Sequence, residues 1–266
     1  DRGDRPMMQL TFGFGAVEAE LWKLVFVMTR IGAALLAAPF FGAAAVPVQL
    51  RVAISGALSV LVCAWIPVAV PPNLLSLAGL LAVAGEVLIG LALGFVLQLS
   101  FAAPVIAAEQ IGGAMGMSIA SAADPISGAH SPALGQYFTV LLTVVFLGLG
   151  AHLTWLRLVF ESYETFPPGA AWLSPERLEL IASFATQMFV AAIAIALPVT
   201  LVLLVVQFVS GVLSRSAPSL NLFALGLPAG VLAGIAALIV AAPLAAEQMA
   251  DLSAEAVTHA GEIIAR

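Results

Sequence analysis

Long runs of apolar residues, separated by short connections that hold proline and polar residues, make up most of this chain. The runs lie at about 21–45, 52–85, 74–100, 104–120, 133–159, 180–214 and 222–246. The second run overlaps the third, and a proline-rich turn at 67–73 separates the helices that the two runs predict. A helix needs about 20 mainly apolar residues to cross the bilayer core. The strands of a membrane barrel would instead alternate apolar and polar residues over segments of about ten residues. The pattern therefore predicts an all-α, polytopic membrane protein of about six to seven apolar helices.

Three parts of the chain differ in character. Residues 1–6 precede two methionines and are expected to be an upstream or disordered extension. Residues 7–246 are predicted to form a single helical membrane domain, and residues 247–266 a polar acidic C-terminal tail with at most a short amphipathic helix. A cleavable signal peptide ending at 43–45 is the weaker alternative, because the charged region before its apolar core would be about thirty residues long.

Composition excludes the soluble classes of protein. An ordinary soluble domain carries about 25% charged residues, whereas this chain carries 9%, with 62% hydrophobic residues and a mean hydropathy of +1.12. Its nine Lys and Arg residues form no basic cluster, which argues against nucleic-acid binding. Cys63 is the single cysteine, so an intrachain disulfide and a multi-cysteine metal site are both excluded. No metal or cofactor is predicted.

Glu86 lies within the third apolar run, where an ionisable side chain is costly and normally faces protein or water. Gly90 and Gly94 follow four and eight positions later, so the three residues share one helix face. Small residues on such a face allow another helix to approach closely. We expect a helix-packing or subunit-interface role for these residues. The alternative, a proton or ion relay, lacks the further acids or histidines that a relay needs.

The same four-residue spacing of glycines recurs at Gly226, Gly230 and Gly234, and at Gly112 and Gly116. We expect the first three to form a second packing or subunit-interface face. The segment around Gly112 is different, because several glycines lower helix propensity by about 1 kcal/mol each. Together with the flexible Met115 and Met117 it suits a movable constriction on a broken helix. A kinked core helix is the alternative.

Catalytic motifs are incomplete in this sequence. Ser118 lies in a sequence that approaches the G-x-S-x-G pattern of hydrolases but ends in alanine. His130 and His152 are the histidines that could assist it, and no third group that would orient them is evident. The sequence therefore predicts a protein that is not an enzyme.

Four segments, in order over about residues 20 to 240, resemble the FliR/SctT-like family of type III secretion export-gate proteins. They are Arg30 with Pro39, Phe40, Pro47 and Arg51; Glu86 to Phe95; Glu109 to Asp124 and Pro125; and Gly211 to Pro228 with Arg215, Pro218 and Asn221. Any one of these segments would be weak evidence. Their shared order makes the resemblance specific, although it does not separate flagellar from virulence secretion.

The resemblance implies a structural channel component of the flagellar type III protein export apparatus, needed for the export of flagellar subunits and for flagellum assembly. It implies packed helical hairpins within a hetero-oligomeric export gate, in the bacterial inner membrane at the flagellar basal body. The implied partners are FliP- and FliQ-like gate subunits, FlhB- and FlhA-like export components, and the exported unfolded flagellar proteins. Position by position, one segment matches the part of the family that helps to close the channel: Gly112, Gly113, Met115, Gly116 and Met117.

Two other functions remain open at this stage. An ion-coupled transporter of small solutes would use Glu86, although such transporters usually carry several polar residues near the middle of the membrane and internal repeats. A membrane hydrolase would use Ser118.

Overall fold

The computed structural model describes residues 15–43, 45–71, 74, 76–117, 132–168, 174–216 and 222–265. This part of the chain holds helices and no strand. The helices are α1 (Gly15–Ala37), α2 (Val48–Trp65), α3 (Leu77–Ala114), α5 (Pro132–Gly148), α6 (Ala151–Thr165), α7 (Pro175–Ser216) and α8 (Leu222–Ala265). The prediction of an all-α chain is confirmed.

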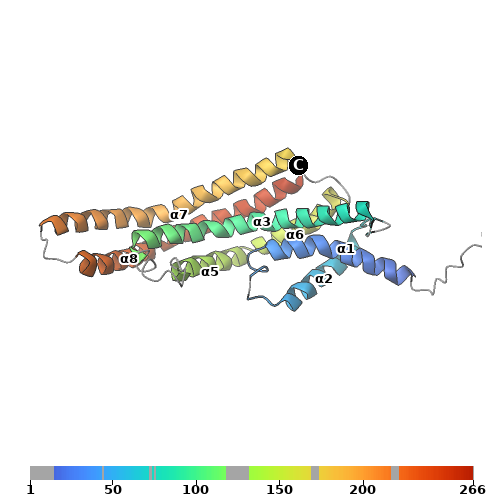
Figure 1. The fold of residues 1–266 in the computed structure, drawn as a ribbon, viewed down its shortest axis with the longest axis horizontal. Helices are drawn as coiled ribbons and strands as arrows, with labels where there is room; N and C mark the ends of the chain where they lie inside the picture. The colour runs from blue at the N-terminus through green and yellow to red at the C-terminus, as the bar shows by residue number, and fades with distance from the viewer. Residues whose placement is uncertain are drawn as a thin grey trace, which may run out of the picture.

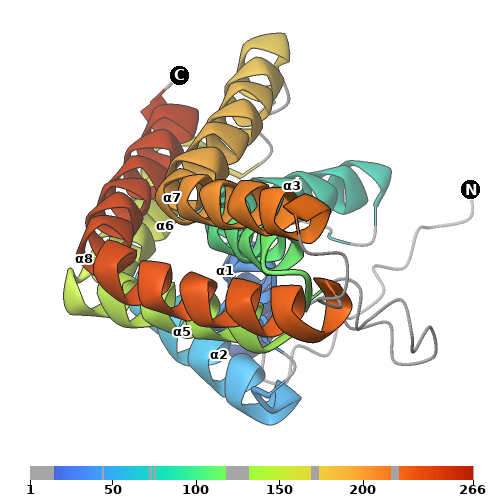
Figure 2. The ribbon, with the colours of Figure 1, turned by 90° about the vertical axis from the view of Figure 1, so that its left-hand side faces the viewer.

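The helices form an elongated bundle in which α3, α7 and α8 run along the long axis (Figure 1). α3 is the central element, because it contacts α1, α5, α7 and α8. Seen from the end where α3 stops and α5 begins, α8 lies along α5 and α7 lies along α3 (Figure 2). The hairpin of α7 and α8 therefore covers one side of α3, while α1 covers another part of it.

One helix, α3, covers Leu77–Ala114 and so joins the described parts of the apolar runs at 74–100 and 104–120, where the sequence suggested two helices. Pro104 lies inside it, although an interior proline removes a hydrogen bond and costs about 3 kcal/mol. Its small neighbours Ala103 and Ala107 are fully buried. Packing of these short side chains against neighbouring helices offsets the cost of the proline, and sequence propensity alone does not reveal that packing.

The run at 133–159 is divided instead, because α5 and α6 meet at an angle of 69°. Gly150 lies between them with φ of +71° and occupies the N-cap of α6. Glycine adopts this left-handed conformation at little cost, whereas other residues are strained there. A single apolar run thus contains a sharp corner, and the corner aims the C-terminal end of α6 at α1.

The C-terminal segment continues α8 as far as Ala265 and does not form a separate tail. Apolar residues recur there every three or four positions, which is the spacing of one helix face. This face is buried against the rest of the bundle and consists of Met249, Leu252, Ala256, Ala260, Ile263 and Ile264. His259 on this helix packs against the ring of Phe184 with centroids 4.7 Å apart. The acids expected in a tail lie on the outer face of the same helix.

Among the described residues, four helical segments are long and apolar enough to cross a membrane, and α5 with α6 makes a fifth if the bent pair counts as one span. The four segments are Val48–Trp65, Leu77–Ala114, Pro175–Ser216 and Pro228–Ala265. α1, which carries Glu18, Glu20, Lys23 and Arg30, is not among them. The prediction of a polytopic membrane protein is confirmed, with fewer spans than there are apolar runs.

Candidate functional site

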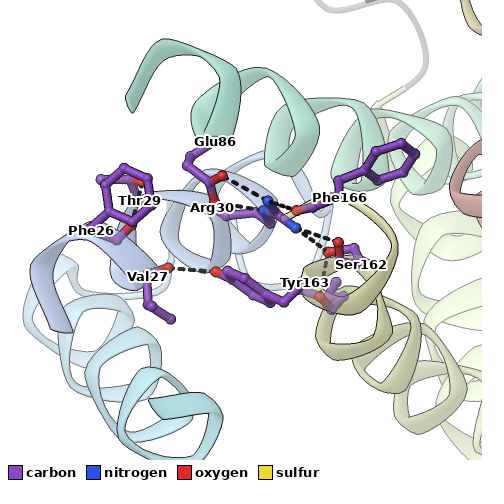
Figure 3. Close-up of polar contacts among 9 residues, drawn as sticks. Phe26, Val27, Thr29, Arg30, Glu86, Ser162, Tyr163 and Phe166 are labelled. Atoms are coloured by element: carbon purple, nitrogen blue, oxygen red, sulfur yellow. Dashed lines mark hydrogen bonds and ion pairs between the residues drawn. The ribbon is translucent and has the colours of Figure 1, made fainter. Parts of the chain in front are cut away.

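Arg30, in the middle of α1, is completely buried and forms an ion pair with Glu86 of α3, which is 1% exposed. Its Nε donates to Oε2 and its Nη2 to Oε1 of the carboxylate, each at 2.8 Å (Figure 3). This two-point arrangement matches the flat guanidinium to the flat carboxylate and is among the stronger hydrogen-bonded pairings in proteins. It joins α1 to α3 in the interior of the bundle.

The remaining donors of Arg30 bind the C-terminal end of α6. Nη1 donates to the backbone oxygen of Ser162 at 2.6 Å and to its Oγ at 3.0 Å, and Nη2 also donates to the backbone oxygen of Phe166 at 2.8 Å. The last carbonyls of a helix lack partners within the helix and carry a partial negative charge, which favours a cation there. All five N–H donors of the guanidinium are thus used.

Tyr163 completes this arrangement from α6. Its ring lies 4.1 Å from the Arg30 guanidinium carbon, within the range of a cation–π contact. Its hydroxyl donates to the backbone oxygen of Val27 at 2.7 Å, which ties α6 to α1 a second time (Figure 3). We call Arg30, Glu86, Ser162, Tyr163 and Phe166 the Arg30 junction. It fixes three helices at one point and leaves no donor of Arg30 over for a transported ion or solute.

Gly90 and Gly94 lie one and two turns beyond Glu86 and face the backbone of α1. A Cβ at Gly90 would collide with the carbonyl oxygen of Arg30, and one at Gly94 would lie 2.5 Å from both the carbonyl oxygen of Ala34 and the Cβ of Ala37. The two helices approach this closely because neither glycine has a side chain. The glycine face thus leads directly into the Arg30 junction.

α3 ends inside the predicted gate segment, here defined as residues 112–117. Gly116 has φ of +84°, and its N–H donates to the backbone oxygen of Gly113 at 3.0 Å. A glycine in this conformation, bonded back to the last turn, is a common way for a helix to end. Gly112 is buried, Gly113 faces open space and Met117 is half-buried. The helix therefore stops at a glycine whose conformation few other residues could adopt.

Met115 in this segment is 5% exposed and packs against glycines of α8. A Cβ placed on Gly234 would lie 2.6 Å from Met115 Cγ, and one on Gly230 would lie 3.1 Å from the Met115 carbonyl oxygen. From α7, the side-chain amide of Gln207 donates to the backbone oxygen of Ala114 at 2.6 Å. Both arms of the α7–α8 hairpin thus contact the end of α3.

The connector residues of the family motif are only partly described. Pro47 occupies the N-cap position of α2, and Arg51 Nη2 donates to the backbone oxygens of Gly42 and Ala43, so this arginine braces the turn before its own helix. Arg215 lies exposed in the last turn of α7. Gly226 is half-buried in α8. Four predicted residues lie outside the described part of the chain, together with Ser118 and His130: Asp124, Pro125, Pro218 and Asn221.

Sequence reasoning missed the partners of Arg30 on α6 and the contact of Gln207. For Arg30, the sequence did contain a signal: it is a lone arginine inside an apolar run, and a buried charge must find partners because its burial is costly. Ser162 lies 132 residues away from Arg30, and Gln207 lies 93 residues away from Ala114. No spacing rule connects residues so far apart. Among the described residues, no group of three histidine, cysteine or acidic side chains is placed to hold a metal ion.

Comparison with known proteins gives a consistent match over nearly the whole chain. Residues 21–256 match the family described as bacterial export proteins, family 1. The flagellar biosynthetic protein FliR of Escherichia coli K12 is 30% identical over 243 residues, which cover 91% of each chain. The protein of the same name from Bacillus subtilis is 32% identical over 221 residues, covering 82% of this chain and 84% of the relative. The one from Pectobacterium carotovorum is 29% identical over 235 residues, covering 88% and 90%.

Proposed function

We propose a channel-forming role for this chain from the premise that it belongs to family 1 of the bacterial export proteins. It is a component of the flagellar type III protein export apparatus, and its several apolar helices place it as a multi-pass protein of the bacterial inner membrane. The relatives compared above are flagellar proteins, so the flagellar system is assigned over virulence secretion. The alternative of an ion-coupled transporter using Glu86 finds no support.

The partners that we propose are FliP- and FliQ-like subunits beside the chain in the gate, and FlhB- and FlhA-like components in contact with it. Support comes from the apolar side chains that α7 and α8 leave uncovered. Among the most exposed are Phe208 at 73% and Val240 at 82%. Long helices with so much free apolar surface suit burial against sister subunits as well as lipid.

Copurification tests this proposal of partners. A tagged chain extracted in mild detergent is expected to carry the FliP- and FliQ-like proteins of the same cell with it. As a control, a tagged unrelated polytopic protein from the same membrane should recover neither. Two results together would contradict the proposal: recovery of the tagged chain only as a lone monomer, and normal swimming of cells from which its gene has been deleted.

We further propose that the gate segment, residues 112–117, helps to close the passage through which unfolded flagellar proteins are exported. The observation that carries this proposal is the end of α3 beside Gly116, which has a positive φ; α3 stops there, while α7 and α8 extend beyond it along the bundle (Figure 1). Met115 is held there by apolar packing and by no ion pair that the structure records. A flexible methionine in apolar surroundings can move out and back without exposing a buried charge.

Deletion of residues 112–117 tests the gate segment. We expect the deleted variant still to copurify with its partners while the membrane becomes permeable to small ions, because the constriction is lost. The measurement is the ion conductance of vesicles that hold the purified complex. A complex that assembles without residues 112–117 and conducts no more than the wild type would remove the gate role.

The chain is proposed to act without a catalytic residue or cofactor. Its most conspicuous buried ionisable pair, Arg30 and Glu86, is held in a fully bonded arrangement that positions helices. A pair whose hydrogen bonds are all made within the protein suits a structural role. An acid–base catalyst must instead be free to exchange its proton with a substrate.

A further inference from the structure

We infer that Gln207, Gly230 and Gly234 are positioning residues that hold the gate segment in place, and we call them the Met115 seat. This inference rests on the proposed gate function of residues 112–117. It adds that the closed position is maintained within this chain, by the α7–α8 hairpin.

The apolar half of the seat is a notch on α8. The Met115 side chain occupies the space that a side chain at Gly234 would otherwise fill, and the Met115 backbone lies against Gly230, where a Cβ would be 3.1 Å from the Met115 carbonyl oxygen. Three atoms of the Met115 side chain, Cγ, Cε and Sδ, would lie 2.6 to 2.8 Å from a Cβ at Gly234. Because Cγ is close to the backbone, rotation of the flexible end alone would not relieve the collision. Any side chain at position 234 must therefore force the whole Met115 side chain, from Cγ outward, out of its present position.

The polar half of the seat comes from α7. Ala114 is the last residue of α3, so its carbonyl oxygen has no partner within the helix. The amide of Gln207 donates to this oxygen at 2.6 Å. The Gln207 contact holds the backbone of α3 at its last residue, and the glycine contact on α8 holds the side chain of the next residue, Met115. Movement of the gate segment away from the hairpin breaks both contacts together.

The central test is Gly234→Ala in the assembled complex. We expect small-ion conductance to rise by about tenfold, equivalent to a shift of about 1.4 kcal/mol between closed and open forms. Gly211→Ala is the matched control, because Gly211 lies on the same hairpin and a Cβ there meets nothing within 4 Å. It should conduct like the wild type. Wild-type conductance for Gly234→Ala in an assembled complex would overturn the inference.

A double variant shows whether the effect passes through Met115. Met115→Ala removes the side chain that Gly234→Ala would displace, so the two changes are expected to be non-additive. The double variant should conduct no more than Met115→Ala alone. Effects that multiply would show that position 234 acts through some other contact and would overturn the inference.

A reversible cross-link provides a test that does not depend on loss of packing. Met115→Cys with Gly234→Cys, in a Cys63→Ser background, places two thiols at the contact. Oxidation should join them and stop the export of flagellar proteins, and reductant should restore it, while oxidation should not change export by either single-cysteine variant. A cross-link that forms without stopping export would overturn the inference, and failure of the thiols to join would contradict the contact itself.

The outcomes separate this inference from the proposal on which it rests. If deletion of residues 112–117 causes a leak but the seat variants do not, the gate function stands and the seat is wrong. If the deletion causes no leak, the gate function fails first.

Discussion

Arg30 shows how a full positive charge can be kept in the interior of a mainly apolar bundle. Its two-point ion pair with Glu86 satisfies part of the guanidinium, and the carbonyls of Ser162 and Phe166 satisfy the rest. Removing water from two charges costs several kcal/mol for each, so the pair persists only because no donor is left without an acceptor. The site therefore depends on every donor of Arg30 having an acceptor, more than on the net attraction between Arg30 and Glu86.

At this scale we predict that Arg30→Met destabilises the protein by about 3–5 kcal/mol, because Glu86 is left as a buried charge without a partner. Replacing both, as Arg30→Met with Glu86→Leu, should cost less than the single change. The measurement is thermal unfolding of the protein in detergent, compared across the variants.

The matched control for this prediction is an exposed pair of the same kind. Arg157 Nε lies 2.6 Å from Glu161 Oε1, with the arginine side chain 78% exposed. Arg157→Met should cost less than about 1 kcal/mol, because solvent screens such a pair. Equal losses of stability for Arg30→Met and Arg157→Met would refute the role assigned to burial.

At the scale of elements, small residues decide which helices touch. α1 and α3 meet at Gly90 and Gly94, while the end of α3 meets α8 at Gly230 and Gly234. Glycine spacing was enough to predict faces of this kind, because positions four apart lie on one side of a helix. It was not enough to identify the facing helix, because a face without side chains fits any helix that presents a complementary surface.

We predict that Gly94→Ala destabilises the protein by about 1–3 kcal/mol, as overpacking of a tight contact usually does. The added methyl group would press on Ala34 and Ala37 and force α1 away from α3. Thermal unfolding in detergent is again the measurement. Gly85→Ala on the same helix is the control, because a Cβ there meets nothing within 4 Å. It should stabilise by about 0.5–1 kcal/mol through helix propensity; if Gly94→Ala proved equally harmless, the close approach would be disproved.

At the scale of the whole molecule, the bundle has two different parts. The Arg30 junction lies where α1, α3 and α6 meet, and it is built from charges and hydrogen bonds that are costly to separate. The end of α3 is held by a methionine and a single amide, which separate more easily. A rigid junction in one part and a weakly held segment in another fit the gate role that we propose for residues 112–117, because such a segment could move while the helices that carry it stay in place.

The apolar runs by themselves determined that the chain is an all-α membrane protein. Helix formation in lipid follows from local sequence, because each backbone group must find its partner within the same segment. The sequence also predicted packing faces from the glycine spacing and a broken helix around Gly112. Only the tertiary structure decided that two runs join through Pro104, that α8 continues to Ala265, and that Arg30 reaches across 132 residues to α6. Those outcomes depend on contacts between segments far apart in the chain, and such contacts leave no periodic pattern in the residues that make them.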